Sequence, residues 1–89
     1  MTQVNGNKER QARVVKVSRD KRPYAAAMAD GIQKPVTFSL DPDHHVWKET
    51  EFPTIGTRVI LSDIRKNDKG WRAQNARFLR PEDEVDQAT

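Results

Sequence analysis

The stretch 56–81, GTRVILSDIRKNDKGWRAQNARFLRP, decides the fold. It contains two runs rich in β-branched, aliphatic and aromatic residues, 57–64 and 71–79, and such runs are typical of strands. Between them, residues 66–70 read KNDKG, and Asn, Asp and Gly are residues that tight turns favour. We therefore expect a β-hairpin. Because an isolated two-stranded hairpin is only marginally stable in water, further strands must cover it.

Three segments upstream also have strand patterns. Residues 11–18, QARVVKVS, are rich in β-branched side chains. Residues 24–29, YAAAMA, contain strong helix formers, but a segment this short between a proline and a glycine turn favours a strand over a stable helix. Residues 35–40, PVTFSL, alternate apolar and polar side chains, as a half-buried strand does. Residues 44–54 are irregular, and we expect Val46 and Trp47 to anchor them to the core, with a binding role for Trp47 as the alternative.

Five short strands with one longer connection, between the third and the fourth, predict a small all-β barrel over residues 11–81. We expect residues 1–10 to form a flexible arm and residues 82–89 to form a disordered acidic tail. Closure of the sheet would remove most of its exposed edges. The side chains expected inside the barrel are Val15, Val17, Val36, Phe38, Leu40, Val59, Leu61, Ala73 and Phe78.

The composition limits the classes of protein to consider. At 89 residues the chain has room for one small domain, and 35% hydrophobic residues suffice for one thin core. The absence of cysteine excludes disulfides and thiolate metal sites and gives no reason to expect an oxidising compartment. No apolar run is long enough to span a bilayer or to serve as a signal peptide. We therefore expect a cytoplasmic monomer without a membrane partner.

Charge is distributed unevenly along the chain. Sixteen Lys and Arg face thirteen Asp and Glu, which gives a formal net charge of +3. Four of the acids lie in the tail 82–89, so the rest of the chain has sixteen basic and nine acidic residues, about +7. The simplest interpretation is a solvated charged surface. A basic excess of this size also favours a negatively charged partner such as nucleic acid.

The hairpin resembles the last two strands of the cold-shock domain, a family that ends with a glycine-led strand and a KGxxAxNV segment. The matching residues are Gly56, Val59 and Leu61 in the first strand and Lys69, Gly70, Ala73, Asn75 and Ala76 in the second. Residues 14–17 with 20–21 resemble the family's first strand and the approach to its first RNA-binding motif, and residues 35–39 occupy the place of the second motif. The resemblance covers residues 11–81. It implies a five-stranded Greek-key barrel of the oligonucleotide-binding (OB) type.

Both nucleic-acid-binding motifs of that family are degenerate in this chain. The family's first motif is a KGFGFI-type run whose aromatic residues stack on bases, whereas residues 21–27 read KRPYAAA and keep one lysine and Tyr24. The second motif is of the VFVH type, whereas residues 36–39 read VTFS, and alternation directs Phe38 inward and Thr37 and Ser39 outward. Stacking is worth about 1–3 kcal/mol per base, so most of the family's aromatic contribution is lost.

The resemblance and the charge pattern together predict binding of single-stranded RNA or DNA with modest sequence preference. In this hypothesis four residues contact phosphates, two stack on bases and two lie at the edge of the groove. They are, in that order, Lys16, Arg19, Lys21 and Arg22, then Tyr24 and Trp71, then Lys69 and Arg72. The alternative is a protein-interaction module that has kept the barrel and lost nucleic-acid binding. A further hypothesis is that the acidic tail binds the basic face in place of phosphate.

No arrangement of residues predicts catalysis, a metal or a cofactor. His44 and His45 are adjacent, so they would point to opposite sides of a strand, and no cysteine or further histidine completes a tetrahedral site. We interpret them as a loop pair. The acids in 41–51 show no carboxylate pair suited to hydrolysis, and the chain has neither a glycine-rich phosphate loop nor a dinucleotide fingerprint. We therefore expect a binding protein and no enzyme.

Overall fold

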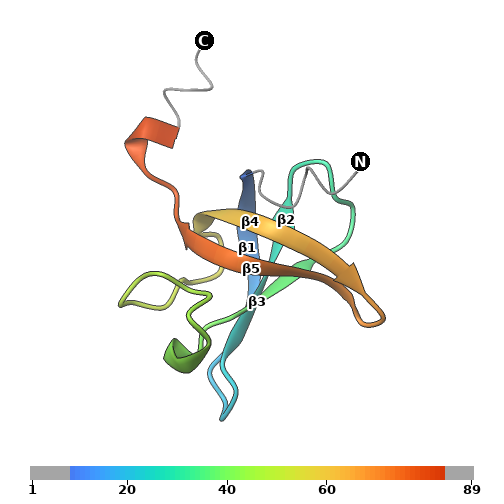
Figure 1. Ribbon diagram of the computed structural model, residues 1–89. Helices are drawn as coiled ribbons and strands as arrows, with labels where there is room; N and C mark the ends of the chain where they lie inside the picture. Colours follow the sequence, from blue (N-terminus) through green and yellow to red (C-terminus); the bar gives the residue numbers. More distant parts are fainter. Residues whose placement is uncertain (1–8, 84–89) are drawn as a thin grey trace.

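The computed structural model describes residues 9–83, which form one closed barrel of five strands (Figure 1). The strands are β1 (Arg10–Ser18), β2 (Tyr24–Ala29), β3 (Val36–Ser39), β4 (Arg58–Asn67) and β5 (Gly70–Phe78). A short 3-10 helix, η2 (Pro42–His44), follows β3, and residues 81–83 make a helical turn. Within residues 9–83, none of the helices has the length and apolar character needed to cross a membrane.

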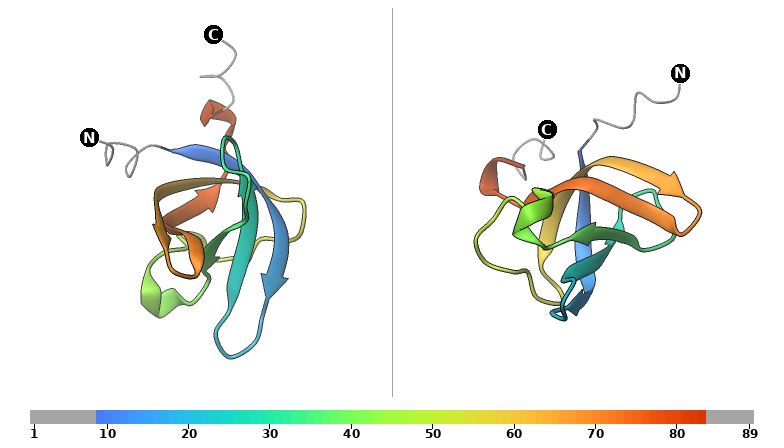
Figure 2. Two further views of the ribbon diagram at one scale, coloured as in Figure 1. Left: turned by 90° about the vertical axis from the view of Figure 1, so that its right-hand side faces the viewer. Right: turned by 60° about the horizontal axis from the view of Figure 1, so that its bottom comes forward.

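The strand order around the barrel is β1-β2-β3-β5-β4, with β4 closing against β1. All neighbouring pairs are antiparallel except β3 and β5, which run parallel with Val36 opposite Trp71 and Thr37 opposite Arg72. Figure 2 shows the barrel from two further sides, with the β1–β2 loop at the bottom in both views. The predicted all-β barrel is confirmed, and its architecture is consistent with the OB type.

The strands lie where the sequence predicts them, with small shifts at their ends. β1 begins at Arg10, inside the predicted arm, while residues 1–8 of the arm and 84–89 of the tail lie outside the described residues. Residues 24–29 form a strand and no helix. The β4–β5 turn consists of Asp68 and Lys69, and Asn67 Oδ1 accepts a hydrogen bond of 2.8 Å from the Lys69 N–H. This is the turn chemistry that the sequence indicates.

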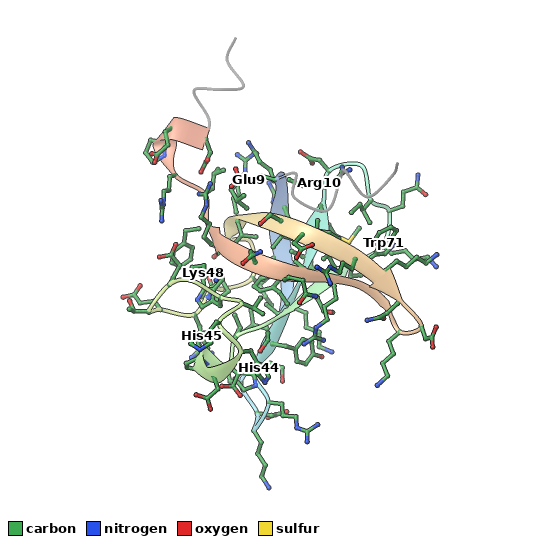
Figure 3. The ribbon with its side chains drawn as sticks, viewed as in Figure 1. Glu9, Arg10, His44, His45, Lys48 and Trp71 are labelled. Atoms are coloured by element: carbon green, nitrogen blue, oxygen red, sulfur yellow. The ribbon has the colours of Figure 1, made fainter. Side chains whose placement is uncertain are left out.

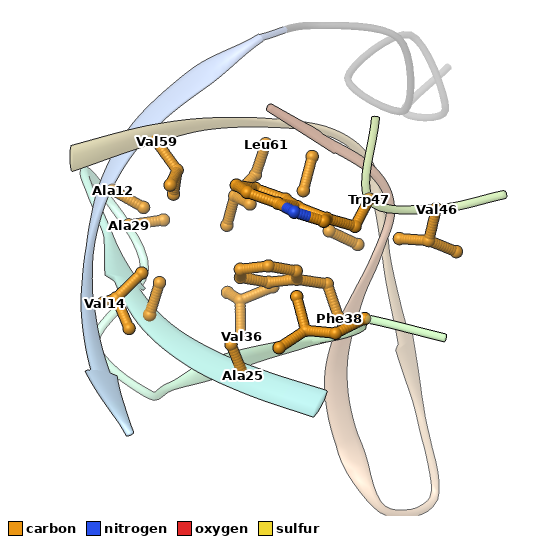
Figure 4. Close-up of a cluster of buried hydrophobic side chains, with 14 residues drawn as sticks. Ala12, Val14, Ala25, Ala29, Val36, Phe38, Val46, Trp47, Val59 and Leu61 are labelled. Carbon is orange, nitrogen blue, oxygen red and sulfur yellow. The ribbon is translucent and has the colours of Figure 1, made fainter. Parts of the chain in front are cut away.

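The barrel is filled by side chains from all five strands and from the connection between β3 and β4. The buried cluster contains Ala12, Val14, Ala25, Ala27, Ala29, Val36, Phe38, Leu40, Val46, Trp47, Val59, Leu61, Ala73 and Ala76. At its centre the Trp47 ring stacks on Phe38 (Figure 4), with centroids 5.7 Å apart. The Trp47 ring also meets Phe78 edge-on at 5.0 Å. The Trp47 indole N–H donates to the Glu51 carbonyl at 2.8 Å. Trp47 thus anchors the irregular connection to the core, as predicted.

The prediction that Val15 lies in the core is wrong. Val15 is 43% exposed, and its neighbour Val14 is fully buried in its place. The register between β1 and β2 shifts between Val14 and Lys16, so Val15 is the extra residue of a β-bulge. On the other side of β1, the Val14 N–H donates to the Thr57 carbonyl at 2.9 Å, which holds Val14 against the turn before β4. The bulge leaves Lys16 exposed and lets Val17 pack against the core.

Candidate nucleic-acid interface

An open hollow lies on the outside of the barrel, between the β1–β2 loop, the end of β3 and β5. Its volume is about 470 Å³. The residues that line it are Arg22, Pro23, Tyr24, Ser39, Asp41, His44 and Arg72. A second hollow shares Arg22 and Tyr24 with the first and adds residues 18–21, from the end of β1 and the β1–β2 loop. We call the two hollows together the Tyr24 groove.

Tyr24 gives the groove its aromatic surface. It is the first residue of β2 and points outward, because the next residue, Ala25, is fully buried inside the barrel. Lys16 Nζ lies 5.5 Å from the centroid of the Tyr24 ring, within the range of a cation–π contact. Hydrogen bonding to Tyr24 raises the pKa of Lys16 above its usual value. A half-buried ring therefore stands beside a positive charge.

Basic side chains outnumber acidic ones along the groove. The basic lining residues are Arg19, Lys21, Arg22 and Arg72, and the acidic ones are Asp20 and Asp41. Both acids already accept hydrogen bonds from the chain, Asp20 from the Ser18 hydroxyl at 3.4 Å and Asp41 from the Asp43 N–H at 2.9 Å. Within residues 9–83, no carboxylate oxygen lies within 4.0 Å of the four basic groups. The groove is therefore electropositive.

His44 is a groove residue that the sequence did not indicate. It ends η2, which Asp41 caps at its start, and the turn brings it back over β3. His44 Nδ1 lies 2.6 Å from Ser39 Oγ, and the same oxygen accepts the Asp41 N–H at 3.1 Å. This contact buries Ser39 to 3% exposure although its side chain lies outside the barrel wall. The available signal was the Asp41-Pro42 turn between Ser39 and His44, which favours a reversal of the chain.

Ser39, His44 and Asp41 do not make a catalytic triad. In a triad the serine hydroxyl and the carboxylate bond to opposite nitrogens of the imidazole, with the carboxylate close enough to orient the ring. Here His44 Nε2 is 3.9 Å from Asp41 Oδ2, which is too long for a hydrogen bond. The imidazole is instead positioned as a polar wall of the groove.

Trp71 and Lys69 lie apart from the groove. Trp71 pairs with Val36 at the start of β3, packs partly against the core and lines another pocket, while Lys69 lies in the exposed β4–β5 turn. Arg72 reaches the groove because successive residues of a strand face opposite sides. Of the eight residues predicted from the sequence, five line the groove and Lys16 flanks it through Tyr24. The two predicted aromatic residues do not share a pocket.

The described start of the acidic tail is bound away from the Tyr24 groove. Arg77 on β5 donates two hydrogen bonds to Asp83, at 2.9 and 3.1 Å, and the Arg80 N–H donates a third at 2.8 Å. Figure 1 shows this end of the chain above the barrel and the β1–β2 loop below it. Residues 84–89 lie outside the described residues. The hypothesis that the tail binds the basic face therefore stays a prediction.

We expect the Arg77–Asp83 pair to make the stability depend on pH. Its hydrogen bonds lower the pKa of Asp83 from its usual 3.8 to about 2. A carboxyl with a lowered pKa in the folded state stabilises the fold above its unfolded pKa and loses that contribution as the pH falls toward its folded pKa. The melting temperature of Asp83→Asn should therefore lie below that of the unchanged protein at neutral pH and approach it near pH 2. An equal gap at both pH values would contradict this role of the pair.

Comparison of the chain with protein-family models, with curated proteins and with solved structures found no match. In the part of the chain from 9 to 83, no three His, Asp or Glu side chains are grouped so that they could hold a metal ion.

Proposed function

We propose that the chain binds single-stranded RNA or DNA in the Tyr24 groove. The observation that carries the proposal is one outward-facing tyrosine surrounded by basic side chains in an open groove. Proteins that bind single strands combine a positive groove, which follows the phosphates, with aromatic rings on which bases stack. In this proposal Tyr24 stacks on a base, while Lys16, Arg22 and Arg72 contact the phosphates on either side of it. The function is binding without catalysis.

We also propose that the barrel is a divergent OB-type relative of the cold-shock domain. Tyr24 lies in the segment that resembles the family's first motif, and Ser39 stands where the second motif has its histidine. His44 brings an imidazole to within 2.6 Å of Ser39 Oγ. A histidine from η2 thus stands beside the position from which the family's histidine is missing, which supports a retained binding surface.

Because the groove has a single tyrosine, the affinity is expected to divide unequally between base stacking and phosphate contacts. One stacked base contributes about 1–3 kcal/mol, so contacts to phosphate must supply much of the affinity. Each phosphate neutralised on a single strand changes the slope of log K against log salt by about −0.7. The groove has five basic side chains, Lys16, Arg19, Lys21, Arg22 and Arg72, and four or five contacts from them give a slope of about −3. Because neither stacking nor phosphate contact reads base edges, sequence preference is modest.

A salt titration tests this proposal. The affinity for fluorescently labelled oligo-U and oligo-dT is measured by anisotropy at increasing salt. We expect tight binding at low salt, a slope of about −3, and a slope smaller by about 0.7 for Arg22→Gln. The matched control is Arg13→Gln, because Arg13 is exposed on β1 and lines a different pocket. The proposal is wrong if neither oligonucleotide binds at low salt, or if both variants reduce the slope equally.

A protein-interaction module is the second candidate. It is favoured by the exposed apolar side chains Val15, Met28 and Ile55, which are 43%, 38% and 70% exposed. Val15 and Met28 lie on the paired strands β1 and β2, and Ile55 lies in the turn whose Gly56 N–H donates to the Val14 carbonyl. Exposed apolar residues close together mark interaction surfaces. Binding there would change little with salt, because screening acts on charges.

A further inference from the structure

A second pocket lies at the opposite end of β3 from the Tyr24 groove. It has a volume of about 400 Å³ and lies between the β2–β3 loop and the end of the β4–β5 hairpin that carries the turn. Three basic side chains and three apolar ones form most of its lining, namely Arg10, Lys34, Lys66, Ile32, Ile64 and Trp71. Figure 3 shows Arg10 and Trp71 on one side of the barrel and His44, at the Tyr24 groove, on the other. We call this site the Trp71 pocket.

The apolar part of the Trp71 pocket is held by the core. Ile32, Ile64 and Trp71 are partly buried and pack against the core cluster. The backbone of Trp71 is fixed by the parallel pairing of β5 with β3, and its carbonyl accepts the Thr37 hydroxyl at 3.3 Å. An aromatic ring that is ordered before binding loses little conformational entropy when a ligand docks. The pocket therefore offers a fixed planar surface.

The rest of the pocket is positively charged. Lys66 Nζ lies 5.8 Å from the centroid of the Trp71 ring, and Lys34 is exposed on the facing loop. No acidic residue lines this pocket. In the described part of the chain, no carboxylate lies within 4.0 Å of Arg10, Lys34 or Lys66. Three positive charges thus surround one aromatic ring without an internal counter-charge.

The β2–β3 loop holds Arg10 in place. Arg10 Nη1 donates to the Asp30 carbonyl at 2.8 Å, so the guanidinium lies against the loop. Gly31 has a φ of +83°, and a Cβ on it would stand only 2.8 Å from Arg10 Nη1. The glycine therefore provides the space that the guanidinium occupies. The remaining N–H groups of Arg10 form a planar set of donors that suits phosphate oxygens.

We propose that the Trp71 pocket binds a nucleotide, with the base against Trp71 and the phosphate between Arg10, Lys34 and Lys66. A base supplies the planar apolar surface that Trp71 and the two isoleucines match, and a phosphate supplies the negative charge that the three basic groups require. Gln33, also in the lining, adds an amide that donates and accepts hydrogen bonds. The same chemistry is present in a free nucleoside monophosphate and in one nucleotide of a single strand. This proposal does not depend on the Tyr24 groove.

The test is a titration of ¹⁵N-labelled protein with AMP, UMP, adenosine and inorganic phosphate. The Trp71 indole N–H resonance, assigned by its absence in Trp71→Phe, is the main probe. We expect AMP and UMP to shift this resonance and the amides of residues 31–34, and adenosine and phosphate to bind at least about tenfold more weakly because each fills half the pocket. Equal affinities for AMP and adenosine, or no shift with either nucleotide, would overturn the proposal.

Variants inside and outside the Trp71 pocket show whether AMP binds in the pocket itself. Lys66→Gln should weaken AMP binding several-fold, and Lys69→Gln, in the same hairpin but outside the pocket, should not change it. Gly31→Ala should also weaken AMP binding, because the new methyl group displaces Arg10.

Tyr24→Ala should leave AMP binding intact, so a failure of the groove proposal can be distinguished from a failure of the pocket proposal. If Trp71→Ala also lowers the affinity for oligo-dT, the pocket holds a nucleotide of a strand; unchanged oligo-dT affinity assigns it to free nucleotides. Equal effects of Lys66→Gln and Lys69→Gln would argue against a built pocket.

Discussion

Trp47→Ala is expected to lower the free energy of unfolding by about 3–5 kcal/mol, the usual loss when a buried aromatic residue is truncated to alanine. Trp47 is 6% exposed and packs against Phe38 and Phe78 at the centre of the barrel. Because the closed ring of strands restrains collapse around the vacated space, a cavity should remain. A domain of this length has roughly 4–13 kcal/mol of stability in total, so the variant should be close to unfolding. Urea denaturation followed by far-UV circular dichroism measures the loss.

Trp47→Phe is the matched control. It keeps an aromatic ring against Phe38 and removes the indole N–H bond to the Glu51 carbonyl. We expect a loss of about 1–2 kcal/mol from that bond and from imperfect filling of the space. If Trp47→Ala were as stable as Trp47→Phe, the connection between β3 and β4 would have no part in the core.

The sequence predicts the fold well where local chemistry decides it. Period-2 alternation in 35–40 and the Asn, Asp and Gly residues of the hairpin turn place two of the elements directly. Trp47 is recognisable as an anchor because it is a large apolar residue in an irregular, polar connection. These signals depend on the residues themselves and on their immediate neighbours, so they are visible before any strand is paired.

The bulge at Val15 shows what the sequence alone does not contain. Three of the four residues in 14–17 are valine, so alternation alone gives no unique inward face. Which valine faces the core is determined by pairing with distant segments of the chain: Val14 bonds to Thr57, and the register between β1 and β2 shifts by one residue. A bulge of this kind is a property of paired strands.

Tyr24→Ala is expected to weaken binding of oligo-U about 5- to 140-fold, because about 1–3 kcal/mol of stacking on one base is lost. Among the described lining residues Tyr24 is the one Phe, Tyr or Trp of the groove, and the His44 imidazole is held against Ser39 at 2.6 Å, so we expect no other ring to take over the stacking role. The variant also loses the cation–π contact that holds Lys16, which weakens one phosphate contact. Fluorescence anisotropy at a single low salt concentration measures the change, with circular dichroism confirming the fold.

Two variants control for indirect effects of this substitution. Tyr24→Phe keeps the ring, so its affinity should stay within about threefold of the unchanged protein. Met28→Ala removes another exposed side chain of β2, outside the groove, and should leave the affinity for oligo-U unchanged. An affinity loss for Met28→Ala that equals the loss for Tyr24→Ala would point to the apolar surface instead.

Part of the candidate site was also predictable from the sequence. Tyr24 and Arg22 lie in one short segment next to a basic turn, so their proximity follows from the chain itself. The separation of Trp71 from Tyr24 does not, because it depends on the parallel register that sets Trp71 beside Val36 at the far end of β3. His44 was missed because an interaction between a serine and a histidine across a turn depends on the turn's conformation, with His45 in the left-handed region at φ 57°.

Titration of ¹⁵N-labelled protein with unlabelled oligo-U at low salt shows whether single strands bind in the Tyr24 groove. Binding there predicts that the amide resonances of Lys16, Arg22, Tyr24 and Arg72 shift together with one saturation curve, and that the shifts diminish when salt is raised. The absence of shifts at these four residues at low salt, or shifts confined to Val15, Met28 and Ile55, would contradict it.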